Sequence, residues 1–247
     1  MTRAELYTVL DRFLAALNAR DPHGLDWAPG AHHSENNVML EIGDGVWGTI
    51  DRLGDYQLRF ADVKTGQVGY FGTVIEPIEE SAFTLRLAVN EAGQFAQCEM
   101  LIVRQSDSGI KFENCRYWDK PILHREPEAP VAREEMVRLS NGYFDTLQRN
   151  DGTIHTKFHP DCNRVENGVQ TTRNPDFAKI VPVSALGCEE QFRMGNYRYD
   201  DDLRARRFPL VDEERGLVLA FGFIDHSGRL REFQLTDGRT VKSPVLR

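Results

Sequence analysis

The side chains best suited to acid–base chemistry lie close together near the start of the chain, in the segment His32-His33-Ser34-Glu35-Asn36-Asn37-Val38. Alternate side chains of a β-strand share a face, so we expect His33, Glu35 and Asn37 to lie side by side. An imidazole titrates near neutral pH, and a neighbouring carboxylate could orient it for proton transfer. The alternative is a surface strand with one polar face, since polar strand residues usually meet solvent.

Charged residues also interrupt apolar strand patterns further along. Arg86 lies inside the apolar run 83–89, and Glu99 and Arg104 flank the apolar run 100–103. A charge in such a run needs either a partner or a wet cavity. These residues therefore indicate either a polar lining inside a cavity or a structural Arg–Glu pair.

Aromatic side chains add a second kind of candidate. Tyr117 and Trp118 end a predicted strand, where a ring could stack on an aromatic ligand or simply pack in the core. We take as candidate catalytic residues His33, Glu35, Arg104 and Tyr117. We take as candidate substrate-binding residues His32, Asn36, Asn37, Trp47, Tyr70, Arg86 and Glu99.

Metal and cofactor motifs are weak or missing in the sequence. His155, His159 and Cys162 have a spacing that could suit zinc, but no second pair such as Cys-x-x-Cys supports it. The sequence contains no Gly-x-Gly-x-x-Gly, no Walker loop and no Gly-x-Ser-x-Gly elbow. We therefore expect neither a metal nor an organic cofactor, and we disfavour nucleotide-dependent enzymes and serine hydrolases.

Composition limits the partners and the compartment. The 247 residues carry a net charge of −8, which argues against a nucleic-acid partner. No apolar run approaches the ~18 residues of a membrane span, and the start of the chain lacks a signal-peptide pattern. The four cysteines have no paired spacing, which favours reduced thiols in a cytoplasmic protein. A small aromatic substrate is the expected partner, and a homo-oligomer is possible.

An internal duplication is visible as matches at one offset. The Glu-Asn pairs that begin at Glu35 and Glu166 are separated by 166 − 35 = 131 positions, and Pro29/Pro160 and Phe13/Phe144 share that offset. A repeat this long predicts two copies of a domain. We predict a first domain over 1–120, a Pro-rich linker over 121–131 and a second domain over 132–247.

The second copy differs from the first at the chemical site. Arg164 takes the place of His33, since 164 − 131 = 33, while Glu166 takes the place of Glu35. Arginine stays charged and cannot serve as a titratable base. We therefore expect the first domain to be catalytic and the second to be structural.

The periodicity predicts an α+β fold. A capping box at Thr2–Glu5 begins an amphipathic helix that ends near Pro22. Strands are predicted at 32–40, 56–63, 67–75, 83–90, 95–104 and 110–118, with a short helical turn at 51–54. In the second half a helix is predicted through Met136–Leu147, and strands at 163–171, 205–211, 217–224 and 229–236. The second copy has no counterpart of the strand predicted at 110–118, so it could lack its last strand.

These motifs together resemble a family of tandem nuclear-transport-factor-2-like (SnoaL-like) domains. The resemblance rests on the Gly-Asp-Gly-Val-Trp-Gly-Thr run at 43–49, the segments 55–62 and 65–72, and the segments 162–172 and 206–216 in the second half. It implies two cone-shaped domains, each with a helix pair or triplet packed on a curved, mostly antiparallel sheet that encloses a pocket. The superfamily includes ketosteroid isomerase, scytalone dehydratase and polyketide cyclases, which act without metal or organic cofactor.

One branch of that family that looks like this sequence contains lyases of lignin-derived diarylpropanes. Such enzymes remove a hydroxyl from a diaryl-propanediol and release formaldehyde, which leaves a stilbene. The resemblance implies a cofactor-independent carbon–carbon lyase, with a dehydratase, an isomerase or a non-catalytic ligand-binding protein as alternatives. His33 departs from the family, which usually has an apolar or aromatic residue there. This departure suggests a specialised site.

Overall fold

The computed structural model describes residues 1–107, 110–118, 123 and 131–243. Helix α1 (Arg3–Ala19) starts at the predicted capping box, in which the Glu5 N–H donates to Thr2 Oγ1 and the Thr2 N–H donates to a Glu5 carboxylate oxygen at 2.7 Å. The helix ends at Arg20, just before Pro22. Its predicted apolar stripe is buried, as expected: Leu6, Leu10, Phe13, Leu14 and Leu17.

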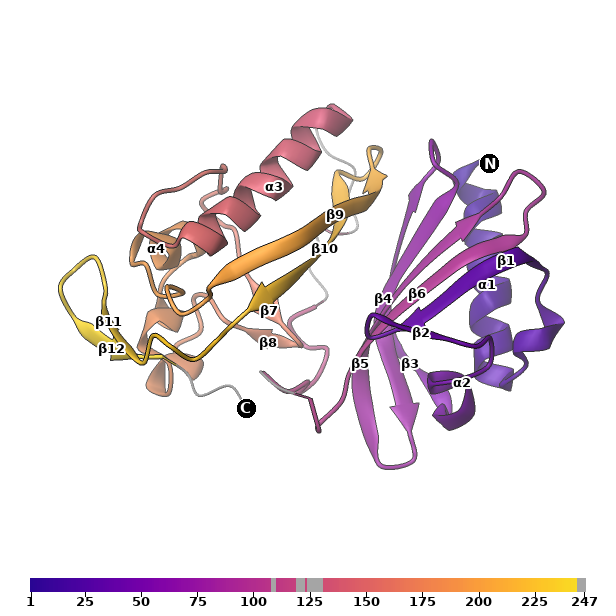
Figure 1. Cartoon of the computed structure of the whole chain (residues 1–247), viewed down its shortest axis with the longest axis horizontal. Helices are drawn as coiled ribbons and strands as arrows, with labels where there is room; N and C mark the ends of the chain where they lie inside the picture. Colours follow the sequence, from indigo (N-terminus) through magenta and orange to yellow (C-terminus); the bar gives the residue numbers. More distant parts are fainter. Residues whose placement is uncertain (108–109, 119–122, 124–130, 244–247) are drawn as a thin grey trace.

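Six strands follow and form one sheet with the order β2-β1-β6-β5-β4-β3. Strand β1 runs parallel to β6, and the other neighbours are antiparallel. The strands are β1 (Trp27–Glu35), β2 (Val38–Leu40), β3 (Arg52–Asp62), β4 (Gln67–Glu76), β5 (Glu79–Val89) and β6 (Phe95–Val103). Helix α1 covers one face of this curved sheet, the face turned away from the C-terminal half (Figure 1). The predicted α+β class is confirmed.

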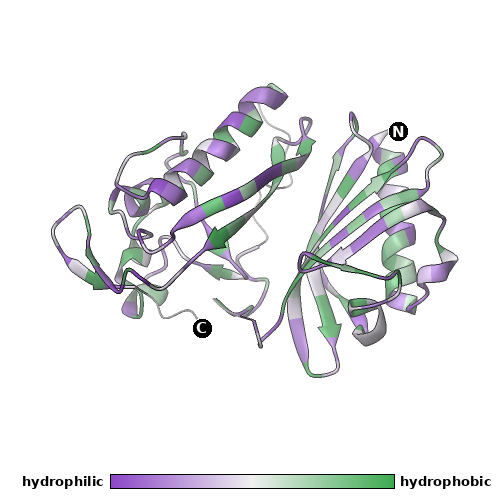
Figure 2. Cartoon of the chain, in the orientation of Figure 1, coloured by the Kyte–Doolittle hydropathy of each residue, from purple (hydrophilic) through white to green (hydrophobic). Residues whose placement is uncertain are grey.

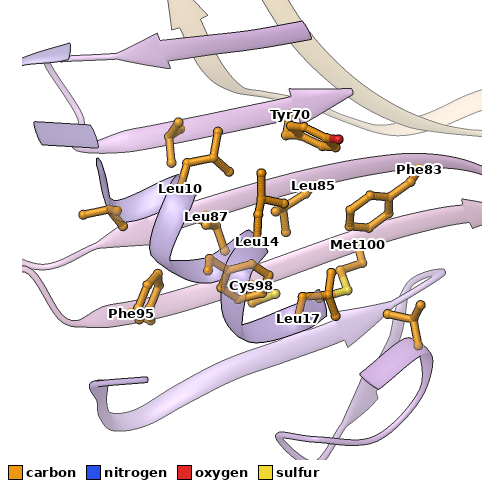
Figure 3. Close-up of a cluster of buried hydrophobic side chains, with 14 of the residues drawn as sticks. Leu10, Leu14, Leu17, Tyr70, Phe83, Leu85, Leu87, Phe95, Cys98 and Met100 are labelled. Carbon is orange, nitrogen blue, oxygen red and sulfur yellow. The ribbon is translucent and has the colours of Figure 1, made fainter. Parts of the chain in front are cut away.

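The alternation of side chains gives this sheet two different faces. Apolar and polar residues alternate along the strands (Figure 2). On the face that meets α1, Leu85 and Leu87 of β5 and Met100 of β6 pack against Leu14 and other helix residues (Figure 3). We call this the inner face and the opposite one the outer face. The inner face holds the main core of the N-terminal half.

Three of the local predictions for this half are wrong. Segment 32–40 is two strands, because Asn36 and Asn37 both have positive φ (47° and 63°), as a two-residue hairpin turn requires. The short helix is α2 (Val46–Thr49), ahead of the predicted 51–54, where β3 has already begun. Segment 110–118 is irregular and forms no strand. The second half therefore does not lack a strand that the first half has at this place.

The C-terminal half is built from shorter elements. Helix α3 (Arg133–Arg149) packs on the long ribbon of β9 (Asp202–Asp212) and β10 (Leu217–Asp225) (Figure 1). Its described residues otherwise form two small hairpins, two 3-10 turns and one short helix. These are β7 (Val165–Glu166), β8 (Val169–Gln170), η3 (Phe177–Lys179), η4 (Pro182–Ala185), α4 (Cys188–Arg193), β11 (Glu232–Gln234) and β12 (Thr240–Lys242).

The sheet of this half is therefore smaller than that of the first half. Strand β12 at Thr240–Lys242 pairs with β11 near the end of the described chain. The predicted linker at 121–131 lies almost wholly outside the described residues, as do residues 244–247. The predicted domain boundaries thus stay predictions.

The ribbon β9–β10 packs on the outer face of the first sheet through reciprocal contacts. The Val211 N–H donates to Asp62 at 3.0 Å, and the Ala61 N–H donates to Asp212 at 2.9 Å. These pairs are related by one offset, since 212 − 62 = 150 and 211 − 61 = 150. An apolar cluster centred on Phe60, Leu210 and Leu219 lies beside them.

The starts of the two long helices complete this pattern. Arg3, the first residue of α1, binds Asp212 at 2.7 Å, and Arg133, the first residue of α3, binds Asp62. Each half thus supplies a helix-start arginine to the carboxylate of the other. This reciprocity supports the duplication predicted from the sequence.

Candidate functional site

His33 lies on the inner face of β1, with Cys98 of β6 as its register partner. Its side chain is 1% exposed, and neither ring nitrogen has a hydrogen-bond partner in the described part of the chain. Burial lowers the pKa of His33, and the nearby Asp44 backbone and Glu35 charge oppose that effect more weakly. The imidazole is therefore neutral at pH 7 and can accept a proton.

Glu35 shares the inner face with His33, as predicted, but it does not bind the imidazole. One carboxylate oxygen accepts the Val46 N–H at the start of α2 at 2.7 Å, and the other accepts from Arg104 at 2.9 Å. Gly45 leaves room for this contact, because a Cβ there would lie 2.3 Å from Glu35 Oε2. Glu35 therefore does not orient the imidazole in this structure, because one of its oxygens holds the start of α2 and the other binds Arg104.

Arg104 bridges two buried carboxylates. It donates to Glu35 and, through Nε at 2.7 Å and Nη2 at 3.1 Å, to Glu76. Thr49 at the end of α2 donates to the same Glu76 at 2.5 Å. Burial alone would raise the pKa of Glu76, but the Arg104 and Thr49 hydrogen bonds lower it. We call Glu35, Arg104, Glu76 and Thr49 the α2 clamp.

The clamp fixes both ends of α2 against the sheet. The sequence analysis missed Glu76 and Thr49. Glu76 ends a strand just before Pro77, and Thr49 follows the Gly-rich turn, so neither interrupts an apolar pattern. Only the pairing of β4, β5 and β6 brings Glu76 beside Arg104.

Trp47 and Tyr70 lie in the inner-face core. The Trp47 ring meets Phe13 edge-on with centroids 5.3 Å apart, and its Nε1–H has no partner among the described residues. Tyr70 donates weakly to the Tyr56 carbonyl at 3.4 Å, and burial raises its pKa to about 12. Figure 3 shows the Tyr70 ring among leucines of this core. Both side chains pack against apolar neighbours rather than facing an open pocket.

Arg86 and Glu99 occupy the outer face, so the prediction that they line the inside of a cone is wrong. They are register partners on β5 and β6 and bind each other at 2.9 Å. Arg86 also donates to Gln67 at 2.6 Å and Gln97 at 2.7 Å. The structural Arg–Glu pair, the alternative from the sequence, is what the structure contains.

A hollow of about 330 Å³ lies over this pair, between the first sheet and β9. We call it the outer hollow. It brings four of the predicted binding residues together, namely His32, Asn37, Arg86 and Glu99. Arg207 of β9 reaches across from the C-terminal half to bind Glu99. The remaining lining residues are Ser34, Met39, Gln97 and Cys98.

Asn36 and Tyr117, the last two candidate residues, lie outside the outer hollow and outside the α2 clamp. Asn36 uses both ends of its amide on Ile102 of β6, at 3.0 Å and 2.8 Å, so it ties the hairpin to the sheet. Tyr117 lies half-buried in the irregular segment 110–118, where the Arg116 guanidinium lies 4.5 Å from its ring centroid. Neither of these residues lines the outer hollow, and neither belongs to the α2 clamp.

The C-terminal counterpart of the His33 position is occupied by a fully engaged arginine. Arg164 binds Glu166 at 2.8 Å and Gln191 at 2.7 Å, and it lies over the rings of Tyr197 and Phe192. This packing is what a structural role requires. It provides no titratable base.

The weak metal motif is not assembled. Across residues 1–107, 110–118, 123 and 131–243 no group of three His, Cys, Asp or Glu side chains could hold a metal ion. His159 Nδ1 accepts the Asp161 N–H at 3.1 Å instead. Within the same ranges no helix is long and apolar enough to cross a membrane.

Comparison with known proteins adds little beyond the fold. A family model described as "Domain of unknown function (DUF8021)" matches residues 129–244. No curated protein matches the chain. Among solved structures, AusH from Aspergillus nidulans matches at 14% identity and a TM-score of 0.35, over 43% of this chain and 88% of its own.

Two further solved structures are similar over a comparable share of the chain. A SnoaL-like family protein from Agrobacterium tumefaciens has 16% identity and a TM-score of 0.30, over 40% of this chain and 97% of its own. A protein of unknown function with a cystatin-like fold from Methylobium petroleophilum has 15% identity and a TM-score of 0.36, over 51% and 98%. Both matches are too distant to assign an activity.

Proposed function

We propose that this protein is a cofactor-independent enzyme that acts on a hydrophobic aromatic small molecule, with His33 as its proton-transfer group. The observation that carries the proposal is the state of His33, which is buried and neutral, with no partner in ordinary hydrogen-bond geometry among the described residues. The Asp44 backbone lies close enough to raise the pKa of His33, but by less than burial lowers it. Buried polar atoms are nearly always paired, so an unpaired imidazole in a core calls for an explanation. A base that meets its partner only when substrate is bound provides one.

The most specific form of the proposal is a lyase of diarylpropane diols. Ionisation of the phenol para to a carbinol releases a proton to solvent. The phenolate expels the carbinol hydroxyl, which takes a proton from solvent and leaves as water, and a quinone methide forms. His33 then takes the proton of the neighbouring hydroxymethyl group. The carbon–carbon bond breaks, formaldehyde leaves, and the electron pair restores the phenolate of the resulting stilbene. A dehydratase or an isomerase would use the same base in a shorter sequence.

Arg104 supports this chemistry electrostatically rather than as an acid. Its hydrogen bonds to Glu76 and Glu35 raise its pKa further, so it stays charged. A fixed positive charge can stabilise a developing phenolate or alkoxide that comes to lie beside it. This scheme assigns no step to Tyr117.

Access to His33 requires movement of α2. The inner face is filled by Trp47, Tyr70 and the α1 leucines, so a diaryl substrate needs space that the closed state lacks. Helix α2 carries Trp47 and is held by the α2 clamp. In this proposal, opening of the clamp moves Trp47 away and admits the substrate to His33.

The test is release of formaldehyde. The purified full chain is incubated with a panel of diaryl-propanediols that carry a free para phenol, with a chelator present and no cofactor added. The proposal expects formaldehyde and stilbene in equal amounts, and the para-methoxy analogues should be inert because they cannot form the phenolate. Absence of both products across the panel would refute the lyase form.

The outer hollow favours a second candidate, a non-catalytic small-ligand-binding protein. Its volume of about 330 Å³ is at the lower end of typical ligand pockets, and it is open without any movement. Native mass spectrometry of the protein as purified separates the two candidates. A stoichiometric ligand that stays unchanged after long incubation, and that is lost in Arg207→Ala but kept in His33→Gln, favours binding.

A further inference from the structure

Two of the four cysteines meet in the C-terminal half. The sulfurs of Cys162 and Cys188 lie 2.9 Å apart, although the residues are separated by 188 − 162 = 26 positions. Cys162 is half-buried in the loop that follows His159, and Cys188 is the buried first residue of α4. The spacing of the cysteines does not predict this pairing, because the contact depends on how this loop folds against α4. Both are free thiols in this structure.

The surroundings make Cys162 the more reactive of the two. A hydrogen bond from the Cys188 thiol and the charges of Arg173 and Arg164 lower the pKa of Cys162 to about 7, so thiolate is abundant at neutral pH. Arg173 also holds the loop in place by donating to the Cys162 carbonyl at 2.7 Å. A thiolate is the form of cysteine that attacks electrophiles.

The thiols of the other two cysteines are harder to deprotonate. Burial raises the pKa of Cys98, which lies wholly inside the core of the first half. Burial also raises the pKa of the half-exposed Cys115 to about 11. Cys115 therefore serves as an internal control with exposure similar to that of Cys162 but an unreactive thiol.

We propose that Cys162 and Cys188 form a redox-active dithiol, which a hydroperoxide converts into a disulfide linking the 159–163 loop to α4. Their sulfurs need to close only from 2.9 Å to the ~2.05 Å of a disulfide bond. A surface hollow of about 330 Å³ lined by Phe158, His159, Arg173 and Cys188, among others, reaches the Cys188 side of this pair. Cys162 does not line the hollow, and a small hydroperoxide would reach it through its own exposed surface, since its side chain is only half-buried.

The reaction proceeds in two balanced steps. The Cys162 thiolate attacks one peroxide oxygen, so an S–O bond forms and the O–O bond breaks. The alkoxide leaves as an alcohol, or as water from hydrogen peroxide, after taking one proton. Cys188 then attacks the Cys162 sulfenic acid, an S–S bond forms, and hydroxide leaves as water with the Cys188 proton. The two sulfurs together lose two electrons, which the peroxide gains.

The disulfide would stiffen the part of the second half that holds Arg164. Helix α4 carries Gln191, which accepts from Arg164 at 2.7 Å, and the 159–163 loop leads directly into Arg164. A disulfide that closes a loop of this length should raise the melting temperature by about 5–10 °C. This inference does not depend on the proposed enzymatic activity.

The experiment starts from the fully reduced full-length protein, treated with one equivalent of hydrogen peroxide at pH 7. We expect two of four thiols to be lost, the mass to fall by two hydrogens, and peptide mapping to join Cys162 to Cys188. Dithiothreitol should reverse all three changes. A disulfide that involves Cys98 or Cys115, a covalent dimer, or over-oxidation of Cys162 without a disulfide would overturn the proposal.

Single variants identify the role of each sulfur. Cys188→Ser should accumulate a sulfenic acid at Cys162 that dimedone traps, whereas Cys162→Ser should give neither a disulfide nor a dimedone adduct. Cys115→Ser should oxidise like the wild type. If Cys162→Ser still forms a disulfide at the wild-type rate, or if Cys188→Ser gives no adduct at Cys162, the assignment of Cys162 as the attacking thiol is wrong.

Discussion

The two halves of this chain contain the same kind of hairpin turn, but the residues around it make different contacts. In the first half the turn after Glu35 has two asparagines with positive φ, and in the second half Asn167 and Gly168 fill the same positions. Glu35 holds the start of α2 and Arg104, whereas Glu166 binds Arg164 within its own hairpin region. The comparison shows that the same backbone turn can occur in both halves while the side chains around it make different contacts.

The interface between the halves has changed much less. Asp62 and Asp212 still make reciprocal contacts with each other's strands, and each receives a helix-start arginine from the opposite half. The segment between the hairpin and this aspartate grew by 150 − 131 = 19 positions in the second half, which is where α4 and the 3-10 turns lie. The two halves therefore differ most in the segment between the hairpin and the interface aspartate.

The largest expected effect separates His33 from its counterpart Arg164. If His33 transfers the proton, His33→Gln should lower kcat by about 10²–10⁴-fold, the usual loss on removing a general base. KM should change much less, because the loss falls on the transition state. Stopped assays of formaldehyde give both constants.

Arg164→Gln is the matched control for that experiment. It removes contacts with Glu166 and Gln191 but no titratable base, so it should lower stability and leave kcat nearly intact. An inactive but folded Arg164→Gln beside an active His33→Gln would place the catalytic site in the second half.

The next effect tests the reciprocity of the interface. Asp62→Asn and Asp212→Asn each remove a buried negative charge from an arginine that is about one-fifth exposed. Each should cost about 2–4 kcal/mol in the free energy of unfolding, somewhat below the cost for a fully buried pair. Urea titration of both variants measures this. Costs that differ by more than about 2 kcal/mol would show that one contact dominates and would break the symmetry.

Prediction from the sequence was strongest where a local pattern determines local structure. The capping box at Thr2 and the apolar stripe of α1 identify that helix without further information, and turn residues separate most of the strands correctly. The placement of His33 and Glu35 on the same face of β1 also follows from strand alternation alone. These features depend on neighbours within a few residues.

Predictions that depended on distant neighbours did less well. For Arg86 the sequence leaves a cavity lining and a structural Arg–Glu pair both open, because strand alternation cannot say which face a helix will cover. Glu76 and Thr49 are not marked by any local pattern, because the contacts of Glu76 in the α2 clamp join it to Thr49 and Arg104, 27 and 28 positions away. The positive φ of Asn36 and Asn37 is permitted but not required by their identity, so the hairpin was taken for a continuous strand.

A smaller effect compares how each half responds to acid. Burial lowers the pKa of His33 in the folded chain below the ~6.5 of the unfolded chain. Between these two pKa values the unfolded chain binds more protons, so the free energy of unfolding decreases as the pH drops below ~6.5. Burial raises the pKa of Asp200 to about 6, so the folded chain binds more protons between ~3.9 and 6, and stability rises as the pH falls through 6. Protonation of these two groups therefore changes the stability in opposite directions over nearly the same pH range.

Single variants separate these two contributions. Between pH 7 and pH 5, His33→Gln should gain stability relative to the wild type, and Asp200→Asn should lose stability relative to the wild type. Thermal melts at half-unit pH steps give both differences. A His33→Gln profile parallel to that of the wild type would mean that the folded-state imidazole titrates normally, and that the buried base of the proposed function is absent.

The smallest effect concerns how the two long helices begin. Helix α1 has a complete capping box, but α3 starts after Ala132, whose side chain makes no capping hydrogen bond. Glu135 already stands three positions later, where a capping box needs it, although it now binds Arg138. Ala132→Ser should therefore complete a capping box on α3 and add about 0.5–1 kcal/mol to the free energy of unfolding, while Thr2→Ala should remove about 1 kcal/mol.

Urea unfolding of the two variants and their double mutant gives these values. The double mutant should lie close to the wild type, because the two caps are remote from each other and their effects should add. A neutral Ala132→Ser would indicate that Glu135 stays with Arg138 and that the two helix starts differ in more than one side chain.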